Sequence, residues 1–345
     1  MSLGEHTRPL AELRQADAAR FGGKSASLGE LIAADIPVPP GFALGTSAFQ
    51  LFLDEAGLVS RVESALAGLD PGDVARVAAV SHALGEEMRS APVPDGVRVE
   101  VAERYASLGD EPPVAVRSSA LGEDSSDATF AGQQETYLWV RGAEGICDAV
   151  RDCWVSLYSP EALTYRARLG DDAAPAMGVT VQLMVDAAVS GVMFTCNPVS
   201  GDPSMVAINA SWGLGLAVVG GEVTPDDYLV SKVTREVVKQ NVSPKEVEYV
   251  PAPSGRGAVR REVEPGRREI ACLDSDRLAA LVDVGRNVER HFGSRQDIEW
   301  AIDGDGELFV VQSRPVTAAA TPAEAAKPTS AIAMVMSKFG AEPNA

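Results

Sequence analysis

The sequence has few of the residues that build covalent or metal-based scaffolds. Its 345 residues include four cysteines and three histidines. The cysteines are Cys147, Cys153, Cys196 and Cys272, and no two of them form a C-x-x-C pair. This spacing argues against a zinc site and against a disulfide framework. We therefore expect buried, reduced thiols, as is ordinary in a cytoplasmic protein.

The sequence also lacks a long apolar run. No stretch reaches the roughly 18 residues that a membrane-spanning helix needs. Residues 1–10 lack the apolar segment typical of a secretory signal. These absences favour a cytoplasmic, soluble protein. Hydrophobic residues make up 46% and charged residues 23% of the chain, which is ordinary for a globular protein that is long enough for two lobes or one large α/β domain.

Positive charge is scarce. The chain has 30 Lys and Arg residues against 49 Asp and Glu residues, a formal net charge of −19. Such a chain repels nucleic acid and anionic membranes unless its cations are concentrated locally. We therefore expect neither as a partner. An anionic ligand would have to be held by a few well-placed cations and a divalent metal ion.

The first candidate for such a place is the segment Gly22-Gly23-Lys24-Ser25, which leads into a predicted helix over residues 25–34. A Walker A loop needs another glycine five residues before Gly23, after a buried strand. That position is Ala18, and no strand precedes it, so this interpretation fails. Two glycines and a lysine at a helix start can still bind an anion, and an exposed, capped helix is the alternative.

The second candidate is Arg117, in the segment Val116-Arg117-Ser118-Ser119. It follows a predicted short buried strand over residues 114–116. An arginine at the end of a buried strand points to where ligands bind in α/β folds, and its planar guanidinium suits phosphate oxygens. A structural ion pair is the alternative.

The third candidate is the loop over residues 127–136, which is rich in small residues and contains Gly132 and Thr136. A predicted strand over residues 135–140 follows it. Such a loop can lay backbone amides over a triphosphate without a side-chain clash. An ordinary hairpin loop is the alternative.

The fourth candidate is a pair of strands near the end of the chain, over residues 296–302 and 307–316. Alternation puts Asp297 and Glu299 on one face of the first strand. On the second strand it puts Gln312 and Arg314 on one face, together with Val310. A four-residue loop, 304–307, would set Glu299 directly opposite Gln312.

A carboxylate beside an amide oxygen is a ligand pair suited to Mg²⁺, which takes one or two protein ligands in addition to phosphates. An arginine close by would neutralise a terminal phosphate. A solvated, charged sheet face is the alternative.

The order of these motifs is more specific than any one of them. Along the chain they are residues 23–25, 116–119, 130–136, 182–185, 190–198 and 297–315. In this order they resemble the ATP-binding domain of phosphoenolpyruvate synthase, pyruvate phosphate dikinase and rifampin phosphotransferase. The resemblance covers roughly residues 8–317. It implies an α/β (α+β) fold of the ATP-grasp type, with lobes near 1–185 and 186–317 that clamp ATP between them.

The resemblance implies a role for each matched residue. Lys24, Arg117 and Arg314 would contact phosphates and act in catalysis, and Glu299 and Gln312 would ligate Mg²⁺. The full set implied to bind ATP is Lys24, Arg117, Gly132, Thr136, Gln182, Glu299, Gln312 and Arg314. Within this set, Gly132 and Thr136 belong to the phosphate loop, and Gln182 lies on the strand that leads to the adenine-side hinge.

In the resembled family, the group derived from ATP passes to a histidine on a separate swivelling domain, and AMP and phosphate are released. The histidines here, His6, His82 and His291, do not lie in a segment that resembles that domain. We therefore expect a phosphohistidine-domain subunit in trans.

Phenylphosphate synthase and cresol phosphate synthase are split enzymes of this type, and their ATP-binding subunit is similar to this chain in length. We therefore expect a phenol or alkylphenol as the final acceptor. The alternatives are a fragment of a pyruvate- or drug-phosphorylating enzyme and a catalytically silent ATP-sensing subunit. Residues 318–328 are expected to form an Ala/Pro linker, and residues 329–345 a tail with a possible docking helix.

Overall fold

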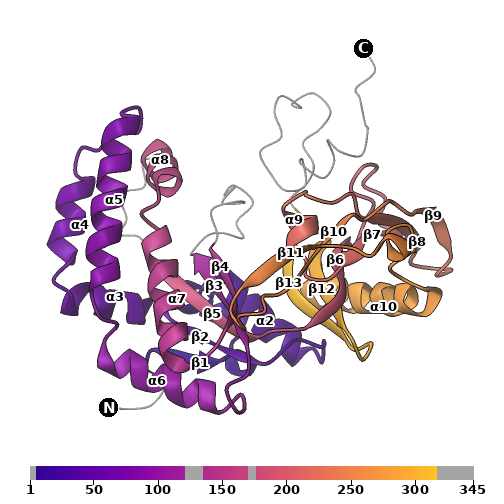
Figure 1. Ribbon diagram of the computed structural model, residues 1–345, viewed down its shortest axis with the longest axis horizontal. Coiled ribbons are helices and arrows are strands. Elements are labelled where there is room, and N and C mark those ends of the chain that lie inside the picture. Colours follow the sequence, from indigo (N-terminus) through magenta and orange to yellow (C-terminus); the bar gives the residue numbers. More distant parts are fainter. Residues whose placement is uncertain (1–4, 121–134, 170–175, 317–345) are drawn as a thin grey trace. The chain divides into compact units, whose positions relative to one another are not determined.

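The computed structural model describes residues 5–120, 135–169 and 176–316 (Figure 1). The described chain divides into two compact units. Unit 1 comprises residues 5–29, 40–120, 135–169 and 176–184, and unit 2 comprises residues 30–39 and 185–316. The predicted linker 318–328 and tail 329–345 lie outside the described residues.

Unit 1 is built on a five-stranded antiparallel sheet. Its strands, in spatial order, are β1 (Thr7–Pro9), β2 (Gly41–Leu44), β5 (Met177–Leu183), β3 (Val114–Ala120) and β4 (Thr136–Val140). The helices that precede β5 in the chain are α1 (Ala18–Phe21), α2 (Gly23–Ala33), α3 (Thr46–Glu55), α4 (Val59–Leu66), α5 (Val74–Ser90), α6 (Asp95–Ala106), α7 (Ala143–Ser156) and α8 (Pro160–Leu169).

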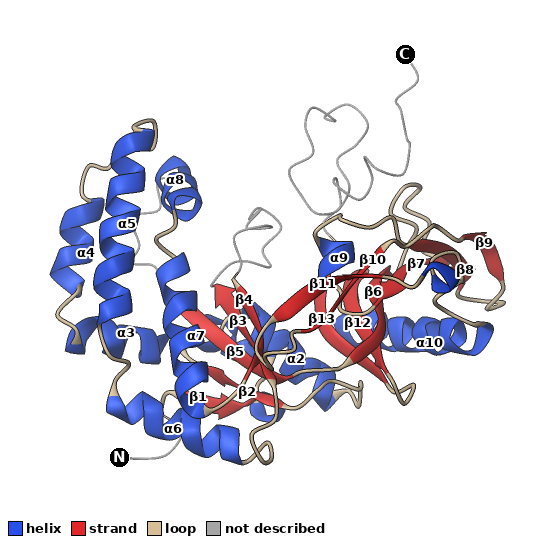
Figure 2. Cartoon of the chain, viewed as in Figure 1, coloured by secondary structure: helices blue, strands red, loops and turns tan. Residues whose placement is uncertain are grey.

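The core of unit 1 lies between one face of this sheet and helices α3 to α8. Val116 and Val181 are direct cross-strand partners on that face, and both are fully buried. Helix α7 packs on β3, β4 and β5 (Figure 2). Its Trp154 ring lies 5.8 Å from Phe49 and 5.1 Å from Phe52, measured between centroids. Each such buried side chain stabilises the fold by about 1.5–3 kcal/mol. The apolar face of the sheet must therefore pack against these helices, and the polar residues lie on its other face.

Unit 2 is built on a six-stranded antiparallel sheet. Its strands, in spatial order, are β13 (Leu308–Pro315), β12 (Gln296–Asp303), β6 (Ala187–Phe194), β7 (Met205–Trp212), β8 (Asp226–Ser231) and β9 (Val237–Asn241). The remaining elements are the hairpin of β10 (Val247–Pro251) and β11 (Ala258–Glu262), the short helix α9 (Leu216–Val219) and helix α10 (Ser275–Phe292).

Helix α10 covers one face of the six-stranded sheet (Figure 1). Asp274 caps its first turn by accepting a hydrogen bond from the Arg277 backbone N–H at 2.8 Å. Gly293, with φ +67°, ends it in the left-handed conformation. The helix spans residues 275–292. Its buried residues repeat at helical spacing and are Leu278, Leu281, Val282, Gly285 and Val288.

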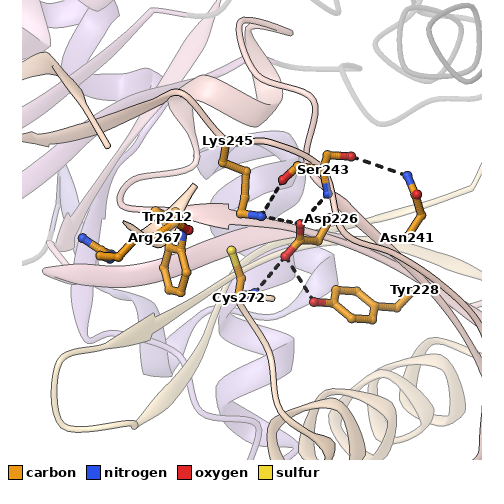
Figure 3. Close-up of polar contacts among 8 residues, drawn as sticks. All are labelled: Trp212, Asp226, Tyr228, Asn241, Ser243, Lys245, Arg267 and Cys272. Carbon is orange, nitrogen blue, oxygen red and sulfur yellow. Dashed lines mark hydrogen bonds and ion pairs between the residues drawn. The ribbon is translucent and has the colours of Figure 1, made fainter. Parts of the chain in front are cut away.

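A buried ion pair crosses the interior of unit 2 (Figure 3). The Lys245 ammonium donates to Asp226 Oδ1 at 2.5 Å, and both side chains are 0% exposed. The backbone N–H of Ser243 donates to the same oxygen at 3.1 Å. The other oxygen, Oδ2, accepts from the Cys272 backbone N–H at 2.8 Å and from the Tyr228 hydroxyl at 3.2 Å. Each carboxylate oxygen thus has two donors, and β8 is tied to two segments that follow it.

The segment over residues 256–268 is partly strand, because β11 pairs with β10. The chain after β11 is held by Trp212, whose indole Nε1 donates to the Arg267 carbonyl at 3.1 Å. The Arg267 guanidinium lies 4.5 Å from the centroid of the same indole ring (Figure 3). These contacts fix the segment beside β7.

One expected strand boundary needs correction. The strand predicted to end at Val116 continues through Ala120, because it pairs with β5 along that whole length. No helix among residues 5–120, 135–169 and 176–316 is both long and apolar enough to span a membrane.

The expectation for the cysteines is confirmed, since Cys147, Cys153, Cys196 and Cys272 are all free and buried. Burial raises the pKa of the Cys147 thiol to about 11 and also raises that of the other three. These thiols therefore remain protonated at neutral pH and act as small apolar side chains.

Candidate functional site

In unit 1 the structure brings the first two sequence candidates together. The Lys24 ammonium donates to the Ser118 carbonyl at 2.7 Å, so the start of α2 is joined to the end of β3. Lys24 is only 4% exposed, which contradicts the alternative of an exposed, capped helix. Gly22 permits this approach, because a Cβ at that position would lie 2.2 Å from the Ser119 carbonyl oxygen.

The same face of this sheet carries the other candidates of unit 1. Arg117 on β3 is the cross-strand partner of both Thr136 on β4 and Thr180 on β5. Partners in antiparallel strands share a face, and so do residues two apart, which adds Gln182. Thr180 shares a hydrogen bond with the Ser25 hydroxyl at 2.7 Å, so α2 lies on this face.

These candidates differ in exposure. Arg117 is 9% and Gln182 is 2% exposed, whereas Thr136 is exposed. Gly132, the remaining candidate of the phosphate loop, lies outside the described residues. Unit 1 therefore gathers Lys24, Arg117, Thr136 and Gln182 on the α2 side of its sheet, opposite the apolar core.

In unit 2 the predicted hairpin is present with the predicted central pair. Glu299 on β12 lies directly opposite Gln312 on β13, and Asp297 lies opposite Arg314. Gln312 is 8% and Asp297 is 5% exposed, so this part of the sheet is not the solvated, charged face of the alternative interpretation.

The path to that register differs from the prediction. Asp303 donates its backbone N–H to the Glu307 carbonyl at 3.1 Å, so the turn has three residues rather than four. Trp300 then pairs with Val310, and a register shift between Trp300 and Glu299 makes Gln312 the next partner. The bulge at Val311 compensates for the shorter turn. As a consequence Val310 lies on the Trp300 face, and its predicted place beside Gln312 is wrong.

Asp297 is a charged neighbour to which sequence reasoning gave no role. Arg314 Nε donates to Asp297 Oδ2 at 2.9 Å. Burial and, to a smaller extent, the nearby Glu299 carboxylate raise the pKa of the Asp297 carboxyl to about 6, against the opposing effect of Arg314. The alternation of the strand already placed Asp297 on the Glu299 face, and that signal could have identified it.

The donor set of unit 2 is suited to Mg²⁺. Glu299 offers carboxylate oxygens and Gln312 an amide oxygen from adjacent strands, and Mg²⁺ prefers oxygen ligands and few of them from protein. Among the described residues there is no cluster of three or more His, Cys, Asp or Glu side chains that could hold a metal ion by itself. A metal bound here would therefore need further ligands, such as phosphate oxygens.

Comparison with known proteins defines the class of this chain. A sequence model of the family described as "Pyruvate phosphate dikinase, AMP/ATP-binding domain" matches residues 18–333. The chain therefore belongs to this family. The α/β, ATP-grasp fold class expected from the sequence is confirmed.

Individual relatives agree with the family. The chain is 40% identical over 314 residues to a probable phosphoenolpyruvate synthase of Methanocaldococcus jannaschii, covering 89% of this chain and 26% of that protein. It is 42% identical over 312 residues to one of Methanothermobacter thermautotrophicus, covering 89% and 45%. It is 41% identical over 315 residues to a rifampicin phosphotransferase of a Streptomyces species, covering 90% and 36%. The chain thus spans less than half the length of each of these relatives.

Solved structures add little to this assignment. D-alanyl-alanine synthetase A from Vibrio cholerae matches with a TM-score of 0.34 and 10% identity, covering 94% of this chain and 65% of that chain. A D-cycloserine synthetase matches with a TM-score of 0.28 and 11% identity, covering 90% and 67%. Similarity at these values carries no argument about this chain.

Proposed function

We propose that this chain binds and cleaves ATP as part of a dikinase-type phosphotransferase. ATP would be converted to AMP and phosphate while a histidine on a partner subunit is phosphorylated. The observation that carries the proposal is the cross-strand pair Glu299–Gln312 with Arg314 beside it, within a domain of the ATP-binding family.

The proposed roles follow from charge. Phosphoryl transfer needs positioning and neutralisation of a polyphosphate more than covalent chemistry from the protein. Lys24 and Arg117 are cations gathered in unit 1, and Arg314 is a cation of unit 2. In a chain of net charge −19, such buried or half-buried cations favour an anionic ligand. When bound by Glu299 and Gln312, Mg²⁺ would supply the remaining neutralising charge.

The neutral polar residues complete the proposed site. Gln182 is a buried amide next to the end of β5, suited to contact the nucleotide on its adenine side. Thr136 opens β4, four residues after Gly132, and is proposed to bind a phosphate together with Gly132. These roles rest on the motif match and on the shared face of the sheet.

A silent, ATP-sensing subunit is the competing proposal. A sensor has no need of both a set of phosphate-binding cations and a pair of metal ligands. Lys24, Arg117 and Arg314 are all present, as are Glu299 and Gln312. Their joint presence favours an active site.

The acceptor is proposed to lie on another subunit. His6 is buried and its ring shares a hydrogen bond with Ser47 at 3.2 Å. His291 Nε2 shares a hydrogen bond with the Glu30 carboxylate at 3.2 Å, and His82 lies exposed on α5. None of the three resembles an acceptor histidine on a swivelling domain. The final acceptor is proposed to be a phenol or alkylphenol, by analogy with split phenylphosphate and cresol phosphate synthases.

The test of this proposal is a reconstitution. With ATP and Mg²⁺ alone, the chain is expected to release AMP and phosphate only at background rate. Addition of a subunit that carries a phosphohistidine domain should start AMP release and label that subunit. Replacement of the partner's acceptor histidine by alanine should remove the label. Phenol and pyruvate, added in separate reactions, would then identify the final acceptor by its phosphorylated product.

Two results would contradict the proposal. Stoichiometric release of AMP and phosphate by the chain alone would show that no partner is needed. Absence of AMP release with every tested phosphohistidine partner, despite tight ATP binding, would favour the sensor instead.

Lys24 and Arg117 give a second prediction. Replacing either by alanine should weaken ATP binding by about one to two factors of ten, since a charged hydrogen bond contributes roughly 1.5–3 kcal/mol. Lys24→Arg should not restore binding, because the buried contact to Ser118 accommodates a compact ammonium and not a planar fork. Calorimetric titration with ATP measures both effects. Unchanged ATP affinity in both alanine variants would show that Lys24 and Arg117 do not bind ATP and have only a structural role.

A further inference from the structure

Strand β7 carries two buried polar side chains that the proposed function does not use. Asn209 is 6% exposed and Ser211 is fully buried. Within the part of the chain that the structure describes, the Asn209 amide nitrogen Nδ2 and the Ser211 hydroxyl have no hydrogen-bond partner. Buried polar groups are nearly always hydrogen-bonded, so two orphans on one strand need an explanation.

The register of the sheet places both residues on the Glu299 face. Glu299 pairs with Val192 on β6, and Val192 pairs with Asn209. Gln312, Glu299 and Asn209 therefore belong to one row across the sheet, with Val192 between the last two. In the neighbouring row, Ala301 pairs with Ser190, and Ser190 pairs with Ser211. Asn209 and Ser211 thus extend the polar face that holds the proposed metal ligands, and they face away from helix α10.

Ser190 provides an internal contrast. It is buried like Ser211 and is its direct cross-strand partner, yet its hydroxyl donates to the Gly213 carbonyl at 2.6 Å. The cover over these strands is therefore bonded to one serine and not to the other. This difference argues against a general failure of the local packing. It indicates that the Ser211 hydroxyl is available to donate to an acceptor atom from outside the chain.

The segment that covers these strands is short and rich in glycine. Val192 packs against a small cluster made by Ala217 and Val218 of α9, a helix of only four residues, together with Val223 and Val247. Gly213 and Gly215 precede this helix, and Gly220 and Gly221 follow it. Such a segment can shift at small cost, since glycine tolerates a wide range of backbone conformations. Gly213 and Leu214 are held by backbone hydrogen bonds to Ala188 and Tyr249, so only the part beyond them is free of such ties to the sheet. A shift of residues 216–221 would open Asn209 and Ser211 to a ligand on the Glu299 face.

We propose that Asn209 and Ser211 are nucleotide-positioning residues, which donate hydrogen bonds to phosphate or ribose oxygens of bound ATP. The inference rests on the proposed function, because it assumes that the nucleotide lies on the Glu299 face. ATP is rich in acceptor oxygens and poor in donors there, which matches orphaned N–H and O–H groups. In the absence of a ligand both groups destabilise the chain, and ATP relieves that cost.

The test compares two matched serine variants, Ser211→Ala and Ser190→Ala. Without ATP, Ser211→Ala should unfold at the same or a higher temperature than the unmodified chain, because it removes a hydroxyl without a partner. Ser190→Ala should unfold at a lower temperature, because it leaves the Gly213 carbonyl without its donor. With MgATP, the ATP-induced rise in unfolding temperature should shrink for Ser211→Ala and persist for Ser190→Ala.

Asn209→Leu is the second variant. It should leave the unfolding temperature without ATP unchanged or higher and weaken ATP binding about tenfold, the equivalent of roughly 1.4 kcal/mol for one lost hydrogen bond. Calorimetric titration measures that affinity. If Asn209→Leu does not fold, the serine pair still decides.

The opposite pattern overturns the inference. If Ser211→Ala or Asn209→Leu unfolds earlier without ATP and keeps the full ATP affinity, the orphaned groups are satisfied by buried water and have only a structural role. Glu299→Ala separates this failure from failure of the proposed function. Loss of MgATP binding in Glu299→Ala, with normal binding in Ser211→Ala and Asn209→Leu, would retain the site and reject its extension to β7.

Discussion

Glu299→Ala is expected to leave ATP cleavage at background while the chain keeps its fold. Glu299 is the one carboxylate of the proposed metal pair, and it lies half-buried opposite Gln312. Without it, Mg²⁺ has no anionic protein ligand in this pair, and the polyphosphate charge is left without its counterion. A partly exposed carboxylate contributes little to packing, so the loss should be functional. AMP release in the presence of the phosphohistidine partner measures the effect.

A matched control comes from the same hairpin. Glu307 lies exposed directly before β13, and Glu307→Ala removes a carboxylate without touching the Glu299–Gln312 pair. Its AMP release should equal that of the unmodified chain. Circular dichroism and thermal unfolding should show that both variants are folded. Normal turnover of Glu299→Ala at saturating Mg²⁺ would contradict the proposal that Glu299 binds the metal ion.

Asp226→Asn is expected to have the largest effect on stability. It leaves the fully buried Lys245 ammonium without its counter-charge. Removal of one partner from a buried ion pair costs about 3–5 kcal/mol, because the remaining charge cannot be solvated. Urea unfolding, followed by the intrinsic fluorescence of the tryptophans, should show a lower midpoint with an unchanged slope.

A surface pair provides the control. Asp283 binds Arg235 at 2.8 Å, but both side chains are about half exposed, at 43% and 51%. Asp283→Asn should change the unfolding free energy by less than about 1 kcal/mol. The double variant Asp226→Asn with Lys245→Met should recover part of the loss, since no isolated charge remains. Equal midpoints for Asp226→Asn and Asp283→Asn would contradict the structural role of the buried pair.

Local patterns predicted a large part of this fold. Helix α10 was predictable over residues 275–292, because Asp274 caps it, Gly293 ends it and its apolar residues recur at helical spacing. The pairing of Glu299 with Gln312 was also predicted correctly, although the turn length on which the prediction rested was wrong. The real turn is one residue shorter, and the bulge at Val311 restores the register. No sequence signal distinguishes that bulge from a longer turn.

Elements without a local pattern were missed. Strand β9, Val237–Asn241, is exposed at every position, so its sequence shows no alternation between buried and exposed residues. Asp226 and Lys245 are 19 positions apart, and only the folded chain brings them together. Ion pairs of this kind depend on tertiary structure and leave no periodic trace.

For the candidate site, the motifs identified individual residues, but only the structure shows which of them lie close together. The sequence identified Lys24 and Arg117 separately, and the fold joins their segments through the contact of Lys24 with the Ser118 carbonyl. Asn209 and Ser211 were not identified, since an Asn and a Ser in an apolar strand carry no motif. Their significance comes from sheet register and from missing partners within the described chain.

The most direct test of the central claim is calorimetric titration of the purified chain with ATP, once with Mg²⁺ and once with a chelator. The account predicts one ATP bound per chain, with an affinity at least about tenfold lower when Mg²⁺ is removed, because the metal joins Glu299 and Gln312 to the phosphates. No detectable ATP binding, or an affinity that is the same with and without Mg²⁺, would contradict it.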